Sequence, residues 1–99
     1  MALLVVPARL RAATAARLLM EAPASGWSAA RLVVRSVAGG LSRDEVADVV
    51  GRPVLADLLH DRSAVHRGER GEPPSVAPRS PLGSLARRIL DDLAAGTAR

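Results

Sequence analysis

Cysteine is absent from this chain of 99 residues, and so are phenylalanine, tyrosine, lysine, asparagine and glutamine. Without cysteine the chain can form no disulfide, no thiol nucleophile and no zinc–thiolate site. Trp27 is the only aromatic residue, so the core must be built from leucine, valine and alanine. Because aromatic side chains supply the largest buried areas, we expect a thin core that gains stability from a partner or a second copy.

Long apolar runs are also missing, because none approaches the ~20 residues that a helix needs to span a bilayer. We therefore expect a cytoplasmic protein without an integral membrane span. The N-terminal segment holds no acidic residue before Glu21 and is rich in arginine, which is also typical of an organelle transit peptide. It lacks the serine enrichment of such peptides, and this favours a packed first helix.

All fourteen basic residues are arginine, and the formal net charge is +4. Residues 1–40 carry five arginines against one acid, residues 41–70 carry five against six, and residues 71–99 carry four against three. The basic excess therefore lies in the N-terminal part of the chain. There it could contribute to binding a polyanion such as DNA.

The middle of the chain carries the clearest local signals. Ser42 and Glu45 have the spacing of a capping box, in which each residue binds the backbone amide of the other. Gly51 suits the left-handed residue that ends a helix, and Pro53 fits the first turn of a following helix. The sequence therefore predicts two helices joined by a tight turn, a hairpin that covers residues 42–66.

Apolar spacing predicts helices on both sides of this hairpin. Residues 1–6 form either a short strand or the lead-in to a helix over residues 7–22. Apolar residues at intervals of three and four predict a helix over residues 27–38 and another over residues 82–96. Proline, glycine and mixed charges make residues 67–81 a linker. We expect an all-α fold, a small bundle of four to five short helices.

These assignments divide the chain into a helical domain at residues 1–66, a linker at residues 67–81 and a C-terminal amphipathic helix at residues 82–96. The last helix either folds back on the core or docks elsewhere. If it docks on a partner, the candidate contact residues are Leu85, Ile89 and Leu93.

Residues able to support catalysis are sparse. No serine lies in a GxSxG turn, and the carboxylates fall on exposed helix faces. Asp57, His60 and Asp61 would share one face of a helix, with a spacing compatible with metal ligands. Such a cluster is more often a solvated acidic patch, so we expect no metal, no cofactor and no enzymatic activity.

Residues 40–53, GLSRDEVADVVGRP, resemble the helix-turn-helix of the promoter-recognising C-terminal region of bacterial sigma factors and related response regulators. The preceding RLVVRSVAG resembles the helix before that motif, so the resemblance spans residues 31–53. The matching residues are Gly40, Leu41, Ser42, Glu45, Val46, Ala47, Gly51 and Pro53.

The resemblance implies that the second helix of the hairpin enters the major groove of duplex DNA. The DNA contacts that the resemblance implies on that helix and its extension are Arg52, His60, Arg62, His66 and Arg67. The arginines of the earlier segments would add phosphate contacts if they face the same side, and these are Arg9, Arg17, Arg31 and Arg35.

Two functions follow from the sequence. One is a small non-catalytic DNA-binding protein of the helix-turn-helix type, acting as a transcription regulator. The other is a protein–protein adaptor or accessory subunit of a larger assembly, docking through its amphipathic helices. The thin aliphatic core, the acidic middle and the terminal amphipathic helix favour the second function, and they also allow a homo-oligomer.

Overall fold

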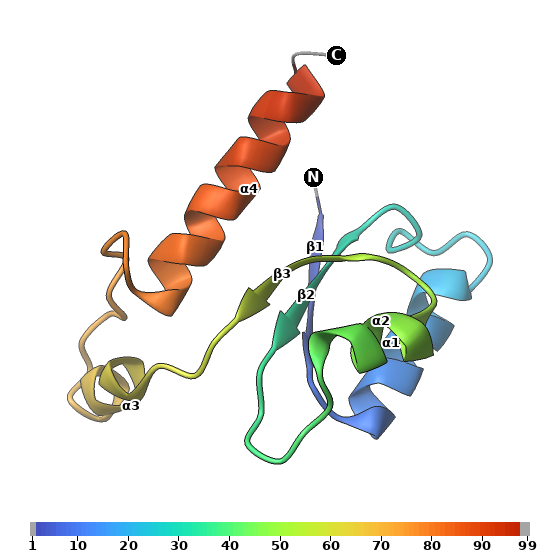
Figure 1. Cartoon of the computed structure of the whole chain (residues 1–99). Coiled ribbons are helices and arrows are strands. Elements are labelled where there is room, and N and C mark those ends of the chain that lie inside the picture. The colour runs from blue at the N-terminus through green and yellow to red at the C-terminus, as the bar shows by residue number, and fades with distance from the viewer. Residues whose placement is uncertain (1, 98–99) are drawn as a thin grey trace. The chain divides into compact units, whose positions relative to one another are not determined.

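The computed structural model describes residues 2–97, and its fold is α/β with three parallel strands in one sheet. The expected all-α bundle is therefore wrong. After Asp57 the chain divides into two compact units. The elements, shown in Figure 1, are β1 (Leu3–Pro7), α1 (Leu10–Glu21), β2 (Arg31–Arg35), α2 (Arg43–Val50), β3 (Val54–Leu58), α3 (Arg62–Glu69) and α4 (Pro81–Thr97).

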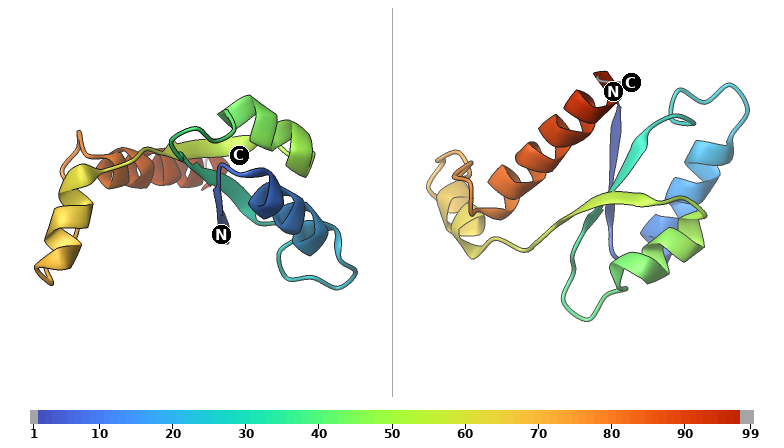
Figure 2. Two further views of the ribbon diagram at one scale, coloured as in Figure 1. Left: turned by 90° about the horizontal axis from the view of Figure 1, so that it is seen from below. Right: turned by 45° about the horizontal axis from the view of Figure 1, so that its top comes forward.

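The first unit is a β-α-β-α-β arrangement whose strands follow the order β1-β2-β3. Strands β1 and β2 run parallel, with Leu4 opposite Leu32 and Val6 opposite Val34. A helix connects each strand to the next, as parallel strands require, because a tight turn cannot return the chain to the same end of the sheet. Helices α1 and α2 lie side by side (Figures 1 and 2).

Strand β2 replaces the helix that was expected over residues 27–38. Leu32, Val33 and Val34 are consecutive and all buried, with at most 2% of each side chain exposed. Strands of parallel sheets show such continuous apolar runs because both of their faces are buried, and β-branched valine favours the extended backbone. Trp27, the first residue of that expected helix, lies before the strand and is 39% exposed.

Strand β3 replaces the helix that was expected to begin at Pro53. Leu55 and Ala56 are adjacent and both buried, at 3% and 8% exposure, as in a strand covered on both faces. Proline fixes only φ, and its value near −65° serves an extended segment as well as a helix. The helix-turn-helix hairpin at residues 42–66 is therefore wrong, because a strand and a separate helix, α3, follow α2.

Helix α2 agrees with its sequence signals. The Ser42 hydroxyl accepts from the Glu45 amide at 3.1 Å, and the Glu45 carboxylate accepts from the Ser42 amide at 2.9 Å. Gly51 ends the helix in the left-handed region at φ 75° and donates its amide to Ala47 O. The hydrogen bonds from the Ser42 backbone and side chain lower the pKa of Glu45.

Replacing Ser42 with alanine should destabilise the protein by about 1 kcal/mol at neutral pH, the usual effect of removing a helix cap. Because the folded pKa of Glu45 is depressed, its contribution to stability is present above its ordinary pKa of 4.5 and is lost as the pH falls through the folded value. Ser42→Ala removes the side-chain part of this effect and keeps the larger part, the bond from the Ser42 amide. Urea titrations should therefore show a slightly smaller difference between Ser42→Ala and the parent at pH 3 than at pH 7. An equal difference at both pH values would contradict this coupling.

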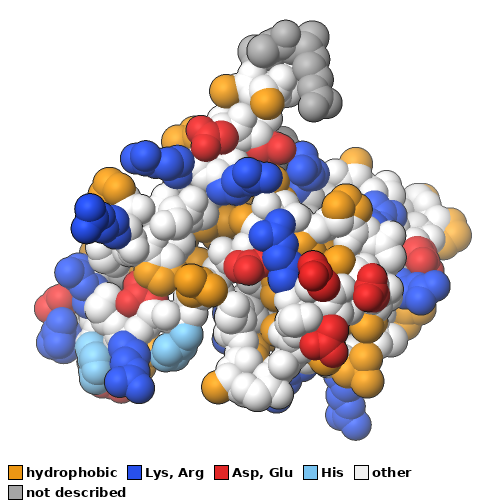
Figure 3. All heavy atoms as spheres, in the orientation of Figure 1, with side chains coloured by type: hydrophobic (Ala, Val, Ile, Leu, Met, Phe, Trp, Pro, Cys, Tyr) orange, Lys and Arg blue, Asp and Glu red, His pale blue; other side chains and the backbone are white. Residues whose placement is uncertain are grey.

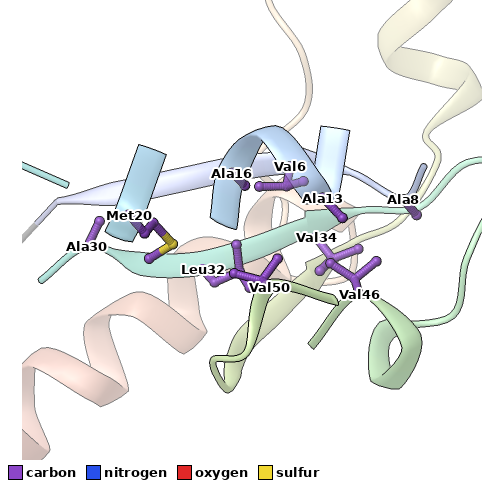
Figure 4. Close-up of a cluster of buried hydrophobic side chains, with 10 residues drawn as sticks. All are labelled: Val6, Ala8, Ala13, Ala16, Met20, Ala30, Leu32, Val34, Val46 and Val50. Carbon is purple, nitrogen blue, oxygen red and sulfur yellow. The ribbon is translucent and has the colours of Figure 1, made fainter. Parts of the chain in front are cut away.

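The core of the first unit lies between the sheet and the two helices (Figure 4). Residues of β1, α1, β2 and α2 share one buried cluster, so both helices cover the same face of the sheet. On α1 the buried residues are mostly alanine, which lets the helix approach the strands closely. The cluster contains Val6, Ala8, Ala13, Ala16, Met20, Ala30, Leu32, Val34, Val46 and Val50.

In the second unit, the expected linker at residues 67–81 is anchored to the start of α4. The Ser80 hydroxyl accepts from the Gly83 amide at 3.0 Å and donates to Ala77 O at 2.7 Å. A Cβ at Gly83 would collide with that same Ala77 carbonyl. The first turn of α4 is therefore held tightly against the segment that precedes it.

Candidate functional site

The apolar side of α4 is the candidate interaction surface. Its leucines and isoleucine recur at intervals of three and four, as expected for an amphipathic helix. From Leu85 onward the exposure of this stripe rises, since Leu85 is 7% exposed, Ile89 is intermediate and Leu93 is 43% exposed. Leu90, beside Ile89, is 65% exposed.

Only the later part of this surface is therefore open to a partner. Of the three residues that the sequence indicates, Ile89 and Leu93 are accessible, whereas Leu85 is buried. Leu90 was missed because it lies beside the stripe of strict three- and four-residue spacing. Its position three residues before Leu93 is the signal that could have found it. We call Ile89, Leu90 and Leu93 the α4 patch.

Arg52 is engaged within the first unit. Its guanidinium donates to Met20 O at 3.3 Å and also to Ser28 O. It thereby binds the last turn of α1 to the loop before β2, with part of its surface buried. Arg31 and Arg35, two of the expected phosphate contacts of this unit, lie at opposite ends of β2 and are exposed.

The other residues that were expected on the DNA-reading helix belong to the second unit. His60 lies in the loop after β3, and Arg62 begins α3. His66 Nδ1 lies 3.8 Å from Glu69 Oε2, and Arg67 donates to Pro73 O at 3.5 Å. In Figure 3 the imidazoles and arginines over α3 have acidic side chains among them. The resemblance implied that these residues would lie on a single DNA-reading helix directly after α2. They do not, because β3 and a loop separate α2 from α3.

The three residues weighed as metal ligands do not share a helix. Asp57 belongs to β3 and forms an ion pair with Arg43, at 3.5 Å between Oδ1 and Nε. Asp61 caps α3 by accepting from the amides of Ser63 and Ala64, and the Ser63 hydroxyl that also donates to it lowers its pKa. Over the part of the chain that the structure describes, no group of three or more potential ligands could hold a metal ion.

A hollow of about 210 Å³ lies where β1 and β2 end. It is open at the carboxyl edge of parallel strands, where α/β proteins commonly bind ligands. Arg9, the N-cap of α1, makes no side-chain hydrogen bond to the helix, so the first amides of α1 remain available for a polar ligand. Glu45 also lines the hollow, and its carboxylate would oppose the binding of an anion there.

Comparison of the chain with protein-family models, curated proteins and solved structures found no match. Within residues 2–97, no helix combines the length and the apolar composition needed to cross a bilayer. The fold and the surface define a class only: a small α/β protein that presents an amphipathic helix with exposed leucines.

Proposed function

We propose that this protein is a non-catalytic protein-interaction module, an accessory subunit that docks on a partner protein through the α4 patch. The observation that carries the proposal is the exposure of Leu90 and Leu93, at 65% and 43%, on a regular helix of 17 residues. Single exposed leucines are ordinary, but exposed leucines that follow one face of a helix are the usual contact residues of helix-in-groove recognition.

The energetics support docking at this surface. Full burial of a fully exposed leucine contributes roughly 1.5–3 kcal/mol. Leu90 and Leu93 are 65% and 43% exposed, so covering both side chains would supply about as much as one whole leucine, a part of the ~8 kcal/mol that micromolar affinity requires. The helix is already formed, and Ser80 and Gly83 hold its first turn. Binding would therefore not require the partner to order the helix, which reduces the entropic cost of association.

DNA binding has weaker support. The resemblance over residues 31–53 requires a reading helix after Pro53, and β3 occupies that position. Acidic side chains also gather over α2 (Figure 3), where Asp44, Glu45 and Asp48 are exposed. Carboxylates repel the phosphate backbone, which supplies much of the affinity of DNA-binding proteins.

Replacing Leu90 with aspartate should weaken the complex with the partner at least tenfold, because a charge would then enter an apolar contact. A photo-reactive amino acid at position 90 of the full chain can identify the partner by mass spectrometry. The affinity of the purified pair is then measured by titration calorimetry.

The matched control is Ala95→Asp, which adds the same charge at an exposed position on the opposite side of α4. It should leave the affinity within twofold of the parent. If position 90 crosslinks to no single protein, or if Leu90→Asp and Ala95→Asp bind equally well, the proposal is wrong.

A further inference from the structure

Strand β1 lies at the edge of the sheet, because β2 alone is its neighbour among the described strands. All five of its residues, Leu3–Pro7, are apolar, and Val5 remains 47% exposed. Native proteins usually protect an edge strand with charged side chains, proline or a covering segment. Strand β1 carries no charged side chain that would discourage the pairing of another strand.

The hydrogen bonds to β2 establish which residues of β1 face outward. Ala2 O accepts from the Arg31 amide at 2.8 Å, and the Ala8 amide donates to Arg35 O at 2.9 Å. In a parallel pair every second residue turns both its amide and its carbonyl toward the neighbouring strand. The even residues of β1 therefore bond to β2, and the amides and carbonyls of Leu3 and Val5 point to the free edge.

Pro7 limits this free edge at its far end. It is also an outward-facing residue, and it has no amide hydrogen to donate. Its carbonyl accepts from the Arg9 amide at 2.7 Å and retains a second lone pair. The free edge thus offers the donors of Leu3 and Val5 and the acceptors of all three outward residues, and a pairing strand must match this short pattern.

The opposite edge of the sheet is protected. The carbonyl of Val54, the first residue of β3, accepts from Arg43 Nη2 at 2.7 Å. The same guanidinium forms the ion pair with Asp57 near the end of β3. Charged side chains at this edge disfavour the addition of another strand. The two edges therefore differ, and only β1 lacks charged side chains.

We propose that β1 pairs with β1 of a second copy of this chain, antiparallel and about a two-fold axis at Val5. The two Val5 residues then exchange both of their hydrogen bonds, and each Leu3 amide donates to the Pro7 carbonyl of the partner. The absent Pro7 donor falls at the two ends of this short ladder, where its loss costs least. The pairing joins the two sheets into one.

The self-complementarity of the segment is the reason for choosing a second copy as the partner. In this register Val5 lies opposite Val5, Leu4 opposite Val6 and Leu3 opposite Pro7, so every cross-strand pair is apolar and no like charges meet. A two-fold interface requires this kind of self-complementary surface. The inference does not depend on the α4 patch, and Leu90→Asp should leave the self-association unchanged.

A charge exchange at position 5 tests the proposal. The parent should be a dimer by size-exclusion chromatography with light scattering, whereas Val5→Glu and Val5→Arg should each be monomeric because like charges meet across the axis. An equimolar mixture of the two variants should restore a dimer that contains one copy of each. Leu18→Glu, which places the same charge at a 65% exposed position of α1, should remain dimeric.

A second measurement keeps the test independent of how well the variants fold. In the parent, hydrogen exchange at the Leu3 and Val5 amides should slow as the protein concentration rises. A parent that is monomeric at millimolar concentration, or outward amides whose exchange is independent of concentration, would overturn the proposal. So would a mixture of folded Val5 variants that stays monomeric.

Discussion

Replacing Gly40 with alanine should destabilise the first unit by about 3 kcal/mol, the upper range for overpacking a tight contact. A Cβ at this position would collide with the backbone carbonyl of Ala8 and would lie 3.0 Å from Val37 O. The carbonyl of Ala8 cannot easily move, because it accepts from the Leu41 amide at 2.7 Å. This contact joins the turn after β1 to the loop after β2.

Urea unfolding followed by circular dichroism measures the effect. The matched control is Gly26→Ala, because a Cβ at Gly26 would meet nothing within 4 Å and its φ is not positive. That substitution should change the free energy of unfolding by no more than about 0.5 kcal/mol. Equal effects of the two substitutions would show that the turn after β1 and the loop after β2 are not in close contact.

Replacing Met20 with alanine should also destabilise the protein by about 3 kcal/mol, within the range for truncating a buried methionine. Met20 is 2% exposed and belongs to the cluster between α1 and the sheet. The neighbouring residues of α1, Ala13 and Ala16, have side chains that are too short to fill the space left by the methionine. The cavity should therefore remain largely open, which places the cost toward the middle of that range.

Leu18→Ala is the control, because Leu18 lies on the same helix and is 65% exposed. Its effect on the free energy of unfolding should stay within about 0.5 kcal/mol. If each variant keeps the parent's dependence of the unfolding free energy on urea concentration, its change in midpoint reports a change in stability and not a change in the compactness of the unfolded state. A larger loss for Leu18 than for Met20 would mean that α1 presents a different face to the sheet.

Local signals in the sequence predicted the local structure of α2 well. The capping box of Ser42 and Glu45 and the left-handed Gly51 are both confirmed, because each depends on residues only a few positions apart. The amphipathic α4 was also predicted with nearly its observed bounds, Pro81–Thr97. Interactions within one helical turn are encoded where they occur, so a sequence read alone can find them.

Strands β2 and β3 were missed because their sequence signals are ambiguous. Leu32–Val34 and Leu55–Ala56 are short apolar runs, and periodicity alone does not distinguish a buried strand from a buried helix segment. Alanine- and leucine-rich flanks favoured helix by intrinsic propensity, and pairing between strands overrode that preference. Because Pro53 was assigned to the first turn of a helix, the capped helix α2 and the strand β3 were predicted as a helical hairpin.

The α4 patch was predicted in part. The stripe of Leu85, Ile89 and Leu93 identified the correct face, but only the structure showed that Leu85 is buried and that Leu90 is exposed. Periodicity assigns a residue to a side of a helix and contains no information about which part of that side the rest of the chain covers. The functional role of the patch remains a proposal.

By itself, the sequence determined the helix α2 with its two caps, the amphipathic α4 and the aliphatic character of the core. Only the tertiary structure decided that the segments after α1 and α2 become parallel strands, because that choice depends on partners far away in the chain. Leu32 and Val34 are extended because Leu4 and Val6 lie beside them. The same pairing leaves the outer edge of β1 free, and no local signal in the sequence could have shown this.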